Sequence, residues 1–109
     1  RVAPHGKAKV RPLAHGREAW VGILTLDAGV AVPEHQDATE EFIHVLDGTG
    51  TITVDGTATP VGPGDTVYMP AGATVSYTNG EVPLRAVQVF AGPAPAAKYD
   101  GWAPAPDTR

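Results

Sequence analysis

The fold is decided mainly by residues 29–48, which read GVAVPEHQDATEEFIHVLDG. Two apolar runs in this stretch flank a polar turn, and a glycine stands at each end. His35 and Asp37 are two residues apart on an extended segment, so their side chains point to the same face. Glu41 begins the next strand directly after the tight turn. The three side chains can therefore converge at one mouth of a β-barrel.

A second stretch, residues 64–79, reads GDTVYMPAGATVSYTN and has the same character. Its proline and glycines mark places where the chain bends sharply or stops pairing at a corner. Strands are predicted over 66–69 and 73–78. Val75 and Tyr77 then share one face of the second of these strands, which makes both candidates for lining a pocket.

The rest of the chain repeats this pattern of short strands and turns. Glycine (13) and proline (11) are too frequent for a helical bundle, and they separate runs rich in valine, threonine and isoleucine. Asp55-Gly56 predicts a type I′ hairpin, because both central positions of that turn need positive φ. About eight to ten strands in all describe an all-β sandwich or barrel. The other predicted strands cover 9–13, 18–27, 30–34, 41–46, 49–54, 57–61 and 84–90.

Length and charge limit the organisation and the partners. The chain has 109 residues, which suits one small domain. We expect an N-terminal arm over 1–17 with an edge strand, a barrel over 18–91, and a Pro/Ala-rich extended tail over 92–109 that Tyr99 and Trp102 could pack onto the barrel. A net charge of −4 argues against nucleic acid as a partner. No apolar stretch approaches the ~18 residues of a membrane span, so we expect a soluble protein, either cytoplasmic or the mature part of an exported one.

The two stretches resemble the two sequence motifs of the cupin superfamily. The first motif, G-x5-H-x-H-x3-E-x6-G, has its matches at Gly29, His35, Glu41 and Gly48. The second, G-x5-P-x-G-x2-H-x3-N, has its matches at Gly64, Pro70, Gly72 and Asn79. Asp37 stands in place of the second His of the first motif, and Val75 stands in place of the His of the second. The resemblance covers about Trp20 to Phe90 and implies a double-stranded β-helix, or jelly-roll barrel.

In cupins the two His, the Glu and the His of the second motif bind a transition metal. Carried over, this implies a metal site at His35, Asp37 and Glu41, whereas Val75 cannot be a ligand. One imidazole and two carboxylates suit a divalent metal such as manganese, iron, nickel or zinc, and no organic cofactor is expected. Two adjacent carboxylates also repel each other unless a cation or a proton separates them. Gln88, on the inward face of 84–90, would line the substrate pocket with Tyr77 and Val75.

The sequence leaves two functions open, and with them the question of whether the protein is an enzyme. The first is a metal-dependent oxygenase or isomerase acting on a small organic molecule, as the ligand spacing suggests. The second is a metal-free binding module for a sugar or small metabolite, because Val75 is what a cupin would carry once its pocket had turned apolar. A weaker third is an interaction domain whose Pro-rich tail binds a partner.

The remaining histidines are not expected to be ligands. His5 lies in the N-terminal arm, where exposure to solvent is expected. His44 alternates with Glu41 along its strand and therefore faces outward, together with Phe42 and Leu46. This apolar outward face would serve a homodimer, since small cupins resemble one another in pairing through an outer sheet or through exchanged N-terminal strands.

Overall fold

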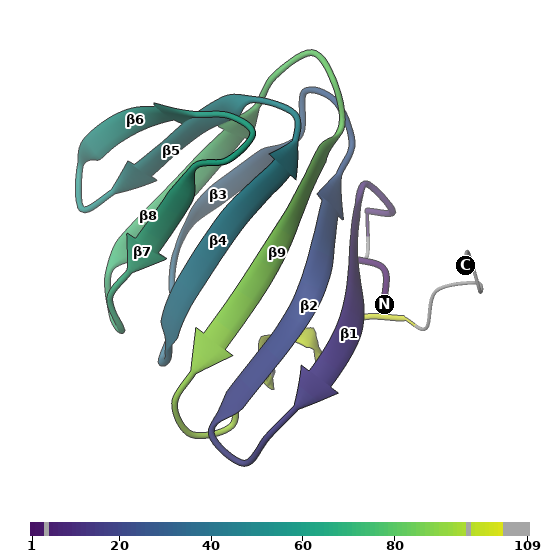
Figure 1. Ribbon diagram of the computed structural model, residues 1–109, viewed down its shortest axis with the longest axis vertical. Coiled ribbons are helices and arrows are strands. Elements are labelled where there is room, and N and C mark those ends of the chain that lie inside the picture. The colour runs from purple at the N-terminus through teal and green to yellow at the C-terminus, as the bar shows by residue number, and fades with distance from the viewer. Residues whose placement is uncertain (4, 96, 104–109) are drawn as a thin grey trace.

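The computed structural model describes residues 1–3, 5–95 and 97–103. Within them the chain forms nine strands and one short 3-10 helix (Figure 1). The strands are β1 Ala8–His15, β2 Ala19–Leu26, β3 Ala31–Gln36, β4 Glu40–Asp47, β5 Gly50–Val54, β6 Thr57–Val61, β7 Thr66–Met69, β8 Thr74–Asn79 and β9 Leu84–Ala91. The 3-10 helix is η1, Ala97–Tyr99. No helix in these ranges is long and apolar enough to cross a membrane.

The strands form two antiparallel sheets that face each other (Figure 1). One sheet has five strands in the order β1-β2-β9-β4-β7, and the other has four in the order β3-β8-β5-β6. Several neighbours are far apart in sequence, as when β9 pairs with both β2 and β4. This arrangement confirms the predicted all-β jelly-roll barrel. β1 is an edge strand and extends beyond the predicted 9–13.

The strands form because apolar residues alternate along them with a period of two. Along β4, Glu41 is buried whereas its neighbour Phe42 is exposed, as the alternation predicted. The same period along β9 buries Gln88. At the β5–β6 turn, φ is 47° at Asp55 and 85° at Gly56, which confirms the predicted hairpin.

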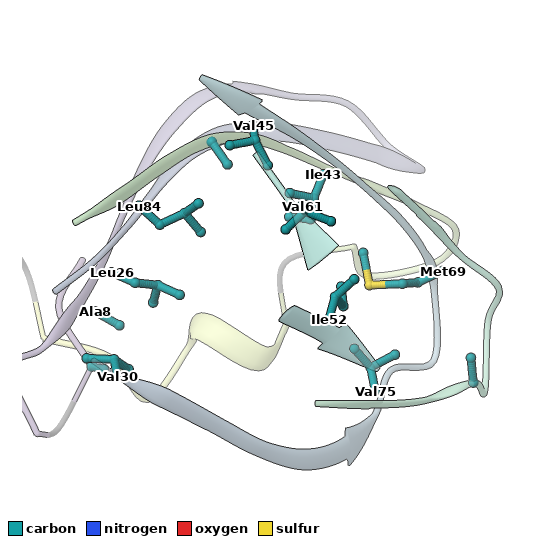
Figure 2. Packing of buried hydrophobic residues seen from close by; sticks show 13 residues of the cluster. Ala8, Leu26, Val30, Ile43, Val45, Ile52, Val61, Met69, Val75 and Leu84 are labelled. Atoms are coloured by element: carbon teal, nitrogen blue, oxygen red, sulfur yellow. The ribbon is translucent and has the colours of Figure 1, made fainter. Parts of the chain in front are cut away.

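Apolar side chains from both sheets form the core between them. Figure 2 shows Val45 and Leu84 from the five-stranded sheet and Ile52 and Val75 from the other, all pointing into the space between the sheets. A smaller aromatic cluster lies at the β1–β2–β9 side of the barrel. Its buried members are Val10, Trp20, Phe90 and Tyr99.

The segment after β9 returns to the barrel. The yellow η1 lies behind β2 and β9 in Figure 1, on the face of the five-stranded sheet that the other sheet also covers. Tyr99 is only 4% exposed and packs on Trp20, with ring centroids 5.5 Å apart. An extended tail was predicted here, with Tyr99 and Trp102 able to pack it onto the barrel, and in residues 97–103 the buried Tyr99 side chain does pack onto the barrel core. Residues 104–109 of the predicted tail lie outside the described ranges.

Candidate functional site

A cavity of about 450 Å³ lies between the two sheets. Much of its lining is apolar, because the inward positions of β2, β4, β5, β6 and β7 carry aliphatic side chains. They include Leu24, Val45, Ile52, Val61, Val67 and Met69. The cavity is thus the part of the barrel interior that core side chains leave unfilled.

Polar side chains gather around the same cavity from four strands and from η1. All six residues that the sequence analysis assigned to the metal site or the pocket line it. They are His35, Asp37, Glu41, Val75, Tyr77 and Gln88. Outside that set, the side chains with polar atoms that line the cavity are His5, Gln36, Tyr99 and Trp102.

His35 and Asp37 lie together where the cavity meets solvent. The His35 Nε2 is 3.5 Å from the Asp37 Oδ2, and the two side chains are 30% and 15% exposed. The other ring nitrogen of His35, Nδ1, is 2.8 Å from the Pro33 carbonyl oxygen. Because a carbonyl oxygen can only accept, we assign the proton of the neutral ring to Nδ1. Nε2 is then the atom of His35 directed at the Asp37 carboxylate.

Glu41, Gln88 and Tyr99 form a buried chain of hydrogen bonds. The Tyr99 hydroxyl donates to the Gln88 Oε1 at 2.6 Å, and the Gln88 Nε2 donates to the Glu41 Oε2 at 2.6 Å. All three residues are at most 5% exposed. Burial, and secondarily the Glu41 carboxylate, raise the pKa of Tyr99 far above its ordinary value. The phenol therefore keeps its proton at neutral pH and acts as the donor at the head of the chain.

Val75 occupies the position of the missing motif-two histidine. It pairs directly with His35 across β3 and β8 and is buried against the cavity. Tyr77 lies two residues further along β8, and its hydroxyl donates to the Asn79 Oδ1 at 3.1 Å. Burial raises the pKa of Tyr77, so it also stays neutral. The β8 wall therefore offers the cavity an isopropyl group and a phenol ring.

The residues present fit a metal ion poorly. In the described part of the chain, no three His, Cys, Asp or Glu side chains gather into a group that could hold one metal ion. The Glu41 Oε2 accepts a hydrogen bond from Gln88, and Val75 has no ligand atom. The metal site predicted at His35, Asp37 and Glu41 thus stays a prediction, although all three line one cavity.

Of the other histidines, His44 faces away from the cavity and His5 lines it. His44 faces outward, as predicted, and its Nδ1 lies 2.7 Å from the Thr66 Oγ1. His5 is exposed, as expected, yet it also lines the cavity. Sequence periodicity could not place His5 or Trp102 there, because both lie outside the strands.

The cupin domain family matches residues 22–90 of the chain. The chain belongs to the cupin family. An uncharacterized protein of Streptomyces coelicolor is 35% identical to this cupin over 77 residues, which cover 71% of this chain and 73% of that protein.

Solved structures share the barrel at lower identity. An RmlC-like cupin from Shewanella frigidimarina superposes with a TM-score of 0.78 at 17% identity, covering 85% of this chain and 83% of that one. The polyketide cyclase RemF from Streptomyces resistomycificus gives a TM-score of 0.70 at 21% identity, covering 78% and 65%. At these identities the likeness shows the fold alone.

Proposed function

We propose that this cupin binds a small, mainly apolar organic molecule in its barrel cavity and does so without a metal ion. The observation that carries the proposal is the cavity of about 450 Å³, which is lined mainly by aliphatic side chains and by a few polar groups, some near solvent and some buried. Ligand sites in general combine an apolar cavity of this size with a few polar groups that orient the ligand.

The aliphatic lining of the cavity favours an apolar occupant. Each Å² of apolar surface that a bound ligand removes from water contributes about 25 cal/mol to binding. Water can enter from the open side, but it finds few hydrogen-bond partners against aliphatic side chains. An apolar ligand would displace this water and contact the aliphatic side chains directly.

The position of the polar groups indicates how the ligand would lie. Its apolar body would contact residues such as Ile52 and Val75, and one polar group would face His35 and Asp37 near the solvent side. A sugar suits this cavity less well than a metabolite with an apolar body, because most of the lining is aliphatic and the buried Glu41, Gln88 and Tyr99 side chains hydrogen-bond one another.

A second candidate is the metal-dependent oxygenase or isomerase that the motif spacing suggests. The observation in its favour is that His35 and Asp37 lie 3.5 Å apart and share the cavity with Glu41. It requires His35, Asp37 and Glu41 to move into one group, which they do not form in the described part of the chain. Because the metal-free proposal needs no such change, it is the function that this geometry supports best.

The proposal is tested with N-phenyl-1-naphthylamine, a neutral fluorescent probe that has apolar rings and one N–H donor. We expect saturable binding of about one probe molecule per chain. The Ile52→Phe variant places a larger side chain in the cavity and should weaken binding at least about fivefold, since overfilling costs ~1–3 kcal/mol.

The matched control is Val87→Phe, because Val87 lies on the outward face of β9 and does not line the cavity. This variant should bind the probe as the wild type does. Fluorescence that rises without saturating, or equal binding by the wild type and Ile52→Phe, would contradict the proposal.

A further inference from the structure

Residues 97–103 form part of the cavity wall although they follow the last strand. Tyr99 and Trp102 both line the cavity, and their rings pack edge to face with centroids 4.7 Å apart. Two backbone hydrogen bonds tie the segment to the N-terminal arm, from the Val2 N–H to the Ala103 carbonyl at 2.8 Å and from the Ala103 N–H to the Val2 carbonyl at 3.1 Å. A molecule in the cavity would therefore touch this segment directly.

Tyr99 also connects the segment to the polar groups of the cavity. Its hydroxyl donates to the only oxygen of the Gln88 side-chain amide, so the amide nitrogen must point the other way, toward Glu41. The Glu41 carboxylate accepts from that nitrogen, so the hydroxyl and the carboxylate together orient the amide from its two ends. Without the hydroxyl, the amide would lose one of these two hydrogen bonds and would be held less firmly. The buried hydroxyl thus helps to position a β9 side chain that in turn contacts Glu41 of β4.

We propose that Tyr99 is a positioning residue that joins segment 97–103 to the ligand cavity, so that ligand binding and packing of this segment stabilise each other. This inference rests on the proposed function, because it concerns the same cavity. When the segment is packed, the cavity has its Tyr99 and Trp102 wall and a fixed Gln88 amide. When the segment detaches, both are lost and the ligand binds less tightly. Thermodynamic linkage then requires the ligand to favour the packed state by the same factor.

The first test measures hydrogen exchange of the wild-type protein with and without N-phenyl-1-naphthylamine. The Ala103 amide reports directly on detachment of the segment, because it donates to the Val2 carbonyl outside it, and the Trp102 amide reports on the turn that the packed segment forms. At a probe concentration ten times the Kd, their exchange should slow by up to about tenfold. The Gly16 amide, which donates to Ala19 in the β1–β2 turn away from the cavity, is the control and should not change.

The second test compares probe binding by two variants that each lose one tyrosine hydroxyl. Tyr99→Phe keeps the ring in the aromatic cluster and should raise the Kd by roughly tenfold, the effect of losing one buried hydrogen bond. Tyr68→Phe is the matched control, because Tyr68 is exposed on the opposite face of the sheet, where its hydroxyl donates to Glu40 at 2.6 Å. Its Kd should change less than about twofold.

The outcomes separate this inference from the proposed function. Saturable binding by the wild type, with an unchanged Kd in Tyr99→Phe and no slowing of exchange at Trp102 and Ala103, would overturn the inference and leave the proposed function standing. Absence of saturable binding by the wild type would overturn both. Slowed exchange in the wild type together with weaker binding by Tyr99→Phe would support the coupling.

Discussion

Replacing Gln88 by leucine should destabilise the fold by about 3 kcal/mol and should reveal the hydrogen-bond chain. The amide of Gln88 satisfies the Tyr99 hydroxyl on one side and the Glu41 carboxylate on the other, at 2.6 Å each. Gln88→Leu has a similar volume but leaves both buried groups without this partner. Each such loss costs ~1–3 kcal/mol, and the leucine gains back part of it by burying apolar surface.

A double-mutant cycle that combines Gln88→Leu with Tyr99→Phe measures the coupling energy between the two side chains directly. Tyr99→Phe alone should cost about 1–2 kcal/mol, because it removes a hydroxyl and leaves the Gln88 carbonyl without its donor. In the Gln88→Leu background the same change removes a hydroxyl that has already lost its acceptor, so it should cost nothing or stabilise. The coupling energy should therefore exceed about 1 kcal/mol.

The assay is urea unfolding followed by the fluorescence of Trp20 and Trp102, with each variant's m-value compared with that of the wild type. A total stability of ~5–15 kcal/mol leaves both single variants and the double variant folded enough to measure. Additive effects, within ~0.5 kcal/mol, would show that Tyr99 and Gln88 act independently and would refute the hydrogen-bond chain.

Three further predictions concern metal binding, pH and association. Val75→His places a second imidazole opposite His35, its partner across β3 and β8. After reconstitution, elemental analysis should find about one Zn²⁺ per chain in this variant and far less in the wild type. Equal metal content in both proteins would contradict the account of Val75. Burial raises the pKa of Tyr99 above its ordinary value of 10.0, so the folded state binds the phenol proton more tightly than the unfolded state does. The stability that this difference contributes is fully present below pH 10 and is lost progressively as the pH rises above 10. From about pH 9.5 to about pH 11, the free energy of unfolding should thus fall more steeply in the wild type than in Tyr99→Phe, and parallel curves would contradict this. We also propose a homodimer through the outward face of the five-stranded sheet, where Phe42 and Tyr68 are 37% and 48% exposed and their ring centroids are 5.0 Å apart. In analytical ultracentrifugation, the wild type should sediment as a dimer and Phe42→Lys as a monomer. A monomeric wild type would rule the dimer out.

Sequence alone predicted the parts of this molecule that depend on local periodicity and turn chemistry. The spacing of His35, Asp37 and Glu41 predicted that they face one barrel mouth, because side chains alternate along strands, and all three line one cavity. The same alternation turned Gln88 inward. The Asp55 turn was predictable because few residue pairs accept positive φ at both positions.

The contacts that decide the chemistry of the site were not predictable from local patterns. Glu41 meets Gln88 because β4 pairs with β9, and strand order depends on long-range packing that periodicity does not encode. Tyr99 enters the core from a segment with no strand or helix period, where two aromatic residues, Tyr99 and Trp102, in a Pro/Ala-rich stretch were the only signal. The volume left between the sheets likewise depends on how all inward side chains pack together.

The central claim is that the barrel cavity binds a small, mainly apolar molecule without a metal ion. The most direct measurement is a titration with N-phenyl-1-naphthylamine of protein that has been treated exhaustively with a chelator, with elemental analysis of the same sample. We predict saturable binding of about one probe per chain, with the same Kd before and after chelation and no stoichiometric metal. Binding that disappears on chelation and returns when manganese, iron, nickel or zinc is added would contradict the claim.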